Sequence, residues 1–156
     1  FVFDTNFRAR GWPDRDVARE AFAAAFATAD IVLTSTEDLL ALYPGESHDQ
    51  LMARIPSPEL VFRLAEPVSL LRFPGGTSEV RAEPMTKPVV DTTAAGDSFA
   101  AAYIAARLAG SEPVEAAQAG HRLASLVICY PGAIIPGYAM PPKKRHRPAA
   151  TRQATK

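Results

Sequence analysis

The segment that decides the fold reads Asp91-Thr92-Thr93-Ala94-Ala95-Gly96-Asp97-Ser98-Phe99. It joins an extended run at residues 87–90 to an alanine-rich stretch at residues 98–109, which predicts a helix. Small residues before a helix leave backbone N–H groups free, and the helix dipole adds positive charge, so we expect an anion site here. Asp97 lies inside that site and would repel a bound phosphate. A carboxylate is explained there if it takes a proton from a hydroxyl while the site holds a transferring phosphoryl group.

The composition is that of one globular domain. The chain has 156 residues, of which 47% are hydrophobic and 22% charged, enough for a single core. No apolar run is long enough to cross a bilayer, so we expect no membrane partner. The single cysteine, Cys129, cannot form an internal disulfide, and we expect it to be buried in a cytoplasmic protein. The chain starts at Phe1 within a predicted strand, which indicates a piece of a longer protein.

The net charge of zero hides an asymmetry. Residues 143–156 contain six Lys or Arg and no acid, so residues 1–142 hold eleven basic and seventeen acidic groups, a net of −6. The tail has no aromatic residue and no pattern of apolar residues, which predicts a disordered, solvated segment. We therefore expect a folded unit at residues 1–142, a disordered basic tail at residues 143–156 and no nucleic-acid partner. Binding of nucleic acid through the tail is the alternative.

The rest of the chain follows the order strand–helix–strand–helix, then a hairpin with a turn at residues 74–76, then two helices. We expect strands at residues 1–3, 30–33, 60–63, 68–73 and 80–82, and helices at residues 17–28, 37–42, 48–54, 98–109 and 113–130. Ser111 is the expected cap of the last helix. This order predicts an α/β fold with a mostly parallel central sheet. Ligands bind such sheets at the carboxyl ends of the strands, where residues 4–6, 34–35 and 91–93 are expected.

Three segments resemble one known family. Residues 91–99 closely resemble the second signature of the PfkB, or ribokinase-like, carbohydrate kinases. Phe3-Asp4-Thr5-Asn6-Phe7-Arg8, followed by Trp12, is similar to the Asp-x-Asn-x-Arg element of the 2-keto-3-deoxygluconate kinases of that family, and Gly132-Ala133-Ile134-Ile135-Pro136 is similar to their closing segment. The family's chain is about twice as long. The resemblance therefore implies a ribokinase-like three-layer sandwich of which residues 1–142 form only the C-terminal half, without the lid strands and most sugar contacts.

The resemblance assigns the chemistry to the opening segment. It implies that Asp97 is the catalytic base, which takes the proton from the sugar's primary hydroxyl and so contacts both ATP and the sugar. Ala94, Ala95 and Gly96 would contact ATP through backbone N–H groups that form the anion hole. One such donor is typically worth about 3 kcal/mol of barrier. A simple acid at the start of a helix is the alternative for Asp97.

Further contacts are implied at the nucleotide. Arg8 would lie near the ATP phosphates and the carboxylate of an acid sugar, since a guanidinium suits either anion. Asn6 and Phe7 would accompany Arg8 at the nucleotide. Ser35 matches a nucleotide-contact position and can also cap a helix. His121 falls where the family reaches the adenine, although a lone histidine on an apolar helix face is more often packing.

The resemblance also implies metal ions. ATP would bind with Mg²⁺, and either Glu37 or Asp38 matches an acid that influences magnesium and phosphate. Asp91 and Thr93 match positions that build a monovalent-cation site, for K⁺, in some relatives.

Two departures from the family pattern stand out. Many relatives have glycine where this chain has Ala94, and alanine resists a positive φ at a cost of about 1 kcal/mol. The family's Lys-x-Gly-x-x-Gly turn at the nucleotide is replaced by Arg63-Leu64-Ala65-Glu66-Pro67-Val68, which has no glycine.

The function implied is the ATP-dependent phosphorylation of a sugar acid, 2-keto-3-deoxygluconate, to its 6-phosphate. The parent enzyme would be a homo-oligomer whose small-molecule partners are the sugar acid and ATP, and the isolated chain would be inactive. Two alternatives stay open from the sequence. One is another PfkB kinase, for fructose, ribose or a nucleoside, and the other is a remnant that binds nucleotide without turnover.

Overall fold

One five-stranded sheet organises the chain in the computed structural model, which describes residues 1–141. The basic tail expected at residues 143–156 lies outside the described residues. The strands are adjacent in chain order and comprise β1 (Val2–Asp4), β2 (Ile31–Ser35), β3 (Glu59–Arg63), β4 (Val68–Phe73) and β5 (Gly76–Arg81). β1, β2 and β3 pair in parallel, whereas β3, β4 and β5 pair antiparallel.

The sheet is therefore mixed, and the expectation of a mostly parallel sheet is wrong. The reason is the length of the connections. β3 joins β4 through residues 64–67, and β4 joins β5 through residues 74–75, and such short turns can connect only antiparallel neighbours. The two parallel pairs are instead connected by segments that contain helices. The antiparallel hairpins occupy one side of the sheet and the parallel strands the other.

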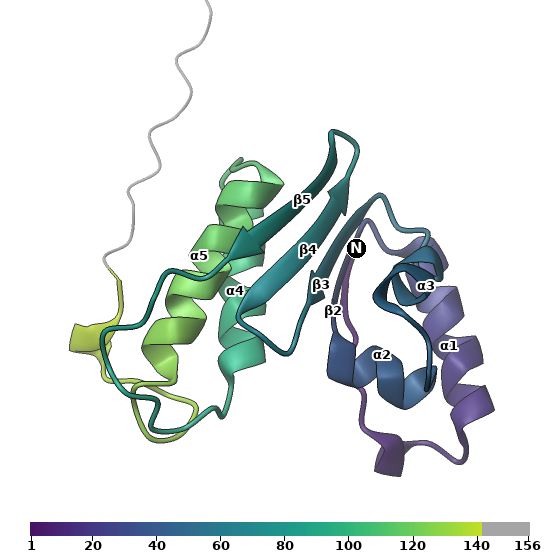
Figure 1. Cartoon of the computed structure of the whole chain (residues 1–156), viewed down its shortest axis with the longest axis horizontal. Helices are drawn as coiled ribbons and strands as arrows, with labels where there is room; N and C mark the ends of the chain where they lie inside the picture. The colour runs from purple at the N-terminus through teal and green to yellow at the C-terminus, as the bar shows by residue number, and fades with distance from the viewer. Residues whose placement is uncertain (142–156) are drawn as a thin grey trace, which may run out of the picture.

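Helices cover both faces of the sheet and give three layers (Figure 1). On one face lie α1 (Arg15–Thr28), α2 (Thr36–Leu42) and α3 (His48–Ala53), and on the other lie α4 (Ala95–Leu108) and α5 (Pro113–Val127). Two short 3-10 helices, η1 (Ala9–Gly11) and η2 (Gly137–Ala139), complete the described chain. No helix within residues 1–141 is long and apolar enough to span a membrane.

Each face of the sheet has its own core. Under α1, the rings of Phe3, Phe22 and Phe26 meet edge to face, with centroids 5.4–6.0 Å apart. Under α4 and α5, Tyr103 and Phe99 pack on Leu33 and Val61 of the sheet. Successive residues of β2 and β3 therefore pack into the cores on opposite faces of the sheet, which fixes the register of both strands.

The extended run at residues 87–90 does not form a strand, which corrects a second expectation. Val89 and Val90 are 55% and 57% exposed, and the Val90 N–H donates to the Ile128 carbonyl at 2.8 Å. Pro88 has no N–H to give to a sheet ladder, which disfavours pairing of this short run. Asp91 thus follows a loop that is tied to the end of α5 rather than a strand.

The caps of α5 and the burial of Cys129 also differ from expectation. Glu112, not Ser111, is the N-cap residue of α5, and the Ser111 carbonyl instead accepts a hydrogen bond from Arg107. The helix ends at Val127, three residues earlier than predicted. Cys129 lies beyond that end and is only half-buried, and its thiol donates to the Ser125 carbonyl.

A buried ionic network joins β3 to α4. Glu59 is 5% exposed at the start of β3, and its carboxylate accepts from the Tyr103 hydroxyl at 2.6 Å. Arg107 donates to both oxygens of the same carboxylate, at 3.0 and 2.8 Å. Burial, helped by the neighbouring carboxylate, raises the pKa of Tyr103 well above its usual range, so its hydroxyl stays protonated as a donor. Three donors therefore depend on one carboxylate.

Replacing that carboxylate should destabilise the fold. We expect Glu59→Gln to lower the free energy of unfolding by about 3 kcal/mol, because the Arg107 charge loses its partner in a half-buried place. Urea denaturation followed by circular dichroism measures the loss. Glu79→Gln is the matched control, since the Glu79–Arg81 pair is exposed and should cost less than about 1 kcal/mol. Equal costs for the two variants would contradict a stabilising role for the buried network.

Candidate functional site

A cleft of about 1060 Å³ opens at the carboxyl ends of β1, β2 and β3. Its other walls are the turn at residues 64–68, the loop at residues 82–92, the start of α4 and one face of α5. The residues that line it include most of those predicted for the site, namely Asn6, Arg8, Ser35, Ala94, Ala95, Gly96, Asp97 and His121. Segments far apart in the sequence therefore meet in one concave place, as expected for a ligand site in an α/β fold.

The start of α4 offers free backbone donors. The Ser98 N–H donates to the Ala94 carbonyl at 2.9 Å, whereas the N–H groups of Gly96 and Asp97 have no acceptor within residues 1–141. The Ala95 N–H is engaged with the Thr92 carbonyl at 3.1 Å. Asp97 is exposed on the first turn of the helix and lines the cleft. The Asp97 carboxylate and two residues with free N–H groups thus line the same cleft. The anion hole predicted at Ala94, Ala95 and Gly96 stays a prediction, although the Ala95 N–H is already engaged.

Ala94, the residue before α4, adopts a left-handed conformation with φ 60° and ψ 16°. An L-residue is strained in this region by roughly 1 kcal/mol, whereas glycine is not. Residue 94 therefore has the positive φ that glycine adopts easily, although it is an alanine. The strained turn comes directly before the residues of α4 that line the cleft.

Burial distinguishes Asp38 from Glu37, the two acids between which the sequence did not decide. Asp38 is buried in α2, and its Oδ2 lies 2.6 Å from the Thr5 hydroxyl, whereas Glu37 is exposed. Thr5 also contacts Thr34 at 3.0 Å between the two hydroxyl oxygens. Asp38 therefore belongs to a polar cluster at the ends of β1 and β2, and it is the better candidate for a role at the phosphates.

Asp4 adds a second carboxylate to this cluster. Its Oδ1 is buried without a hydrogen-bond partner among the described residues, and the nearest cation is Arg63, with Nη2 3.7 Å away. Burial raises the pKa of Asp4 above its ordinary value, Arg63 opposes the shift, and Asp38 and Asp97 add to it. Asp38 and Asp97 thus lie close enough to affect Asp4.

These residues fit a magnesium ion bound largely through substrate. Within residues 1–141 there is no cluster of three or more His, Cys, Asp or Glu side chains able to hold a metal alone. Mg²⁺ commonly needs only one or two carboxylates and takes its other ligands from phosphates and water. The unpartnered Asp4 oxygen and the Asp38 carboxylate provide that donor set.

Asp91 is held by two backbone donors. Its Oδ1 accepts from the Thr93 N–H and its Oδ2 from the Gly132 N–H, each at 2.8 Å. The hydrogen bonds from Thr93 and Gly132 lower the pKa of Asp91. The carboxylate therefore ties the loop before α4 to the loop after α5. The monovalent-cation role of Asp91 and Thr93 stays a prediction.

The predicted nucleotide contacts of residues 6–8 divide into two kinds. Asn6, with φ 33°, and Arg8 are exposed and line the cleft. Phe7 is buried and packs its ring against Phe22, with centroids 5.7 Å apart. The side chain of Phe7 thus belongs to the core, and only its backbone could approach a nucleotide.

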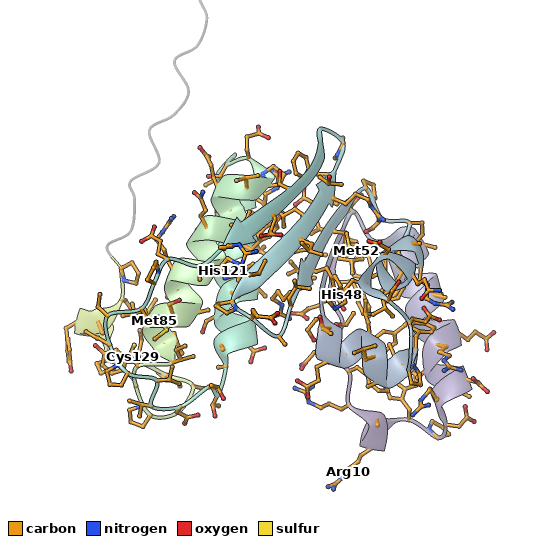
Figure 2. All side chains as sticks on the ribbon, viewed as in Figure 1. Arg10, His48, Met52, Met85, His121 and Cys129 are labelled. Atoms are coloured by element: carbon orange, nitrogen blue, oxygen red, sulfur yellow. The ribbon has the colours of Figure 1, made fainter. Side chains whose placement is uncertain are left out.

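Ser35 and His121 each have a structural role as well as a place in the cleft. The Ser35 hydroxyl accepts from the Asp38 N–H at 3.2 Å and caps α2. His121 lies on the side of α5 that faces the sheet (Figure 2), with Nε2 3.0 Å from the Ser69 hydroxyl and its ring edge-on to Phe99. Burial lowers the pKa of His121, the Arg63 charge lowers it further, and a hydrogen bond to the Val80 backbone opposes both.

The prediction from sequence missed Arg63 as a site residue. Its guanidinium lines the cleft beside Gly96 and Asp4. A charged residue at the carboxyl end of a predicted strand indicates a ligand contact, and Arg63 has that position.

Known proteins resemble the chain in sequence and structure. A family model described as pfkB family carbohydrate kinase matches residues 1–139. Two 2-dehydro-3-deoxygluconokinases, from Escherichia coli K12 and Dickeya dadantii, are 37% and 39% identical over 145 residues. Each match covers 90% of this chain and 47% of the relative, so the chain spans about half the length of these relatives. The matched family region contains the whole cleft.

A solved structure shows the same arrangement of elements. The aminoimidazole riboside kinase from Salmonella enterica, complexed with aminoimidazole riboside and an ATP analog, matches with a TM-score of 0.72 and 27% identity. The match covers 85% of this chain and 46% of that chain. Sequence and structure comparisons thus agree that the chain corresponds to less than half of its relatives.

The strain at Ala94 predicts a stabilising substitution. We expect Ala94→Gly to raise the free energy of unfolding by about 0.5 kcal/mol, because relief of the positive φ exceeds the entropy gained by the unfolded chain. Ala101→Gly, within α4, is the control and should lower stability by about 1 kcal/mol. Urea denaturation measures both, and a loss of stability in Ala94→Gly would show that the alanine is not strained.

The buried histidine predicts a pH dependence. Because the folded-state pKa of His121 lies below its ordinary value of 6.5, the unfolded chain binds the extra proton first. This contribution to stability is complete above pH 6.5 and is lost as the pH falls through the folded-state pKa. His121→Gln should reduce the slope of unfolding free energy against pH in the acidic range, as measured by urea denaturation. His48→Gln, at an exposed histidine, should keep the wild-type slope, and equal slopes for both variants would contradict the assignment.

Proposed function

The chain belongs to the pfkB carbohydrate kinase family, and we propose that it forms the phosphoryl-transfer half of an ATP-dependent kinase for a sugar acid. The proposed substrate is 2-keto-3-deoxygluconate, the compound also called 2-dehydro-3-deoxygluconate, and the product is its 6-phosphate. The similarity to two 2-dehydro-3-deoxygluconokinases supports this substrate. The observation that carries the chemistry is the position of Asp97 beside two free N–H groups on the first turn of α4.

Asp97 acts as the general base in the proposed reaction. Its carboxylate takes the proton from the primary hydroxyl, the hydroxyl oxygen attacks the γ-phosphorus of ATP, and the bond from that phosphorus to the departing ADP oxygen breaks. The N–H groups of Gly96 and Asp97 donate to the oxygens of the transferring group, where negative charge must be held. Exposure of Asp97 to the cleft lets a substrate hydroxyl reach it.

The nucleotide lies along the cleft in this proposal. Arg8 and Asn6 approach the phosphates from the end of β1, and Ser35 contacts the nucleotide from the start of α2. The base lies between the loop at residues 82–92 and the face of α5 that bears His121. Mg²⁺ bound with ATP would neutralise phosphate charge, and Asp4 and Asp38 would hold it.

Arg8 can also distinguish an acid sugar from a neutral one. It is exposed at the cleft, and a guanidinium binds a carboxylate through paired N–H donors. The chain spans about half of its relatives, so the rest of the sugar pocket would come from sequence outside it. For this reason we expect the isolated chain to bind ATP weakly and to transfer no phosphoryl group.

Asp97 is the residue whose replacement tests the reaction. In a longer protein that contains this chain, Asp97→Asn should lower turnover at least about 100-fold with little loss of stability, because an amide cannot accept the proton. A coupled assay of ADP release with 2-keto-3-deoxygluconate measures turnover. Asp49→Asn is the matched control, since Asp49 occupies the first turn of α3 outside the cleft lining. Near-normal turnover in Asp97→Asn would exclude the role of general base.

The isolated chain gives the second test. Calorimetric titration with ATP and Mg²⁺ should show weak binding, and the same coupled assay should show no ADP release above background. Release of ADP that depends on 2-keto-3-deoxygluconate would overturn the view that the chain supplies only half of the site. Activity of the longer protein on fructose but not on the sugar acid would overturn the proposed substrate.

A further inference from the structure

Thr5 places a buried hydroxyl directly after the carboxyl end of β1. The residue is 5% exposed, and its N–H donates to the Leu33 carbonyl of β2 at 2.9 Å. Because threonine branches at Cβ, few side-chain rotamers are open to it. The pairing of its backbone and the restriction of its side chain together fix where the hydroxyl lies.

Two hydroxyl groups in series lead to the Asp38 carboxylate. The Thr34 and Thr5 hydroxyl oxygens are 3.0 Å apart, and the Thr5 oxygen lies 2.6 Å from Oδ2 of Asp38. Thr34 is fully buried. An ionised carboxylate only accepts and each hydroxyl has one proton, so Thr5 donates to Asp38 and its oxygen accepts from Thr34. Hydrogen bonds in such a chain polarise one another, which strengthens the contact to the carboxylate.

The Asp38 carboxylate does not bind within its own helix turn. Ser35 caps α2, and Asp38 is the third residue after it, a position from which a side chain can turn back to the N–H of the cap residue. In α3 the corresponding residue does so, since the Ser47 N–H donates to Oε1 of Gln50 at 2.8 Å. The Asp38 carboxylate instead reaches across to the end of β1, where Thr5 binds it.

The second oxygen of Asp38 stays available. Oδ1 accepts no hydrogen bond from residues 1–141, and it is not fully buried. Asp38 lines the cleft together with Asp4, whose Oδ1 also lacks a partner among the described residues. Thr5 itself is absent from the lining. One oxygen of Asp38 is therefore held from behind, and the other is left for a ligand in the cleft.

We propose that Thr5 is a positioning residue, which holds Asp38 in the orientation that binds a magnesium ion entering with a nucleotide. The proposal rests on the role proposed above for Asp38 and deepens it, since it names the group that orients this carboxylate. Hydrogen bonds from outside the coordination sphere orient metal-binding carboxylates, and their loss typically weakens metal binding about 10- to 100-fold.

The test compares ATP binding to the whole 156-residue chain with Mg²⁺ and with EDTA, by calorimetry. The ratio of the two affinities, called here the magnesium gain, reports on the metal contacts. Thr5→Val keeps the shape of the side chain without its hydroxyl, and should lower the magnesium gain about 10-fold with little change of affinity in EDTA. Thr5→Ser restores the hydroxyl on a less restricted side chain, and should recover most of the gain.

Ser57→Ala is the matched control, because it also removes a buried hydroxyl that makes a hydrogen bond. Ser57 is 4% exposed, donates to the Glu59 carbonyl at 3.0 Å and lies outside the cleft lining. This variant should keep the wild-type magnesium gain. Circular dichroism shows whether each variant is folded. If Thr5→Val does not fold, Thr34→Val, which removes only the outer hydroxyl, should still lower the gain by a smaller factor.

A double-mutant cycle tests whether Thr5 acts through Asp38. Asp38→Asn alone should lower the magnesium gain, because an amide is a poorer ligand for Mg²⁺ than a carboxylate. Adding Thr5→Val to Asp38→Asn should then have no further effect on the gain. Losses that simply add would show that Thr5 acts independently of Asp38 and would overturn the inference.

The remaining outcomes separate this inference from the proposed kinase function. An unchanged magnesium gain in Thr5→Val would overturn the inference, and so would equal losses of affinity with Mg²⁺ and with EDTA, which would indicate a structural role. A wild-type chain whose ATP affinity does not depend on Mg²⁺ would overturn it too. A Thr5-dependent magnesium gain, in a chain whose longer protein transfers no phosphoryl group, would support the inference and reject the kinase function.

Discussion

The placement of α4 along β3 is the constraint on which the rest of the structure depends. β3 has an ionic residue at each end, and both contact α4. Glu59 at the start of the strand binds Tyr103 and Arg107 in the second half of the helix. Arg63 at the end of the strand lies against Gly96 in the first turn. Because the helix is held at two points, its free N–H groups are kept at the carboxyl edge of the sheet, where the cleft opens.

The second helix of that layer depends on the absence of a side chain. A Cβ on Gly120 of α5 would lie 2.8 Å from the Phe99 ring, so only glycine allows α5 to pack this closely on α4. The next residue, His121, then reaches Ser69 on β4 and forms part of the cleft wall. The close packing at Gly120 therefore determines where the His121 side chain lies. Glycines in this fold matter where layers meet as well as where turns form.

Local features of the fold could be predicted from the sequence, whereas long-range ones could not. The helix at residues 15–28, the cap at Ser35 and the small-residue start of α4 depend on neighbours a few residues away, and the sequence predicts all three within a few residues. The direction of each strand depends on its connection and partner. The sheet was expected to be mostly parallel, but two of its four pairs are antiparallel, because the connections at residues 64–67 and 74–75 are too short for a parallel crossover. Residues 91–93 were likewise expected at the end of a strand, whereas the extended run before them pairs with no strand of the described chain.

In the candidate site, too, some residues can be predicted from the local sequence and others depend on long-range contacts. Asp97 and Gly96 belong to a contiguous motif, so the role proposed for them follows from the sequence alone. Arg63 becomes a site residue only through the register that brings the end of β3 beside a helix more than thirty residues later. The choice between Glu37 and Asp38 likewise needed the burial of one carboxylate and the exposure of the other. The motif thus predicts where the proposed reaction takes place, and packing shows which charges lie around that place.

The charge balance of the cleft indicates what must accompany a polyphosphate. Asp38 and Asp97 lie near Asp4, and their negative charges add to the effect of burial, which raises the pKa of Asp4. The cation buried among them is Arg63. A nucleoside triphosphate would add several negative charges to a space that already holds three acids and a helix dipole of only about half a unit charge. Arg63 and Arg8 cannot neutralise that total, so the site favours a nucleotide that enters with a divalent cation. The Asp4 oxygen that lacks a partner then has a physical explanation, since a carboxylate left unsatisfied by the protein is available to that ion.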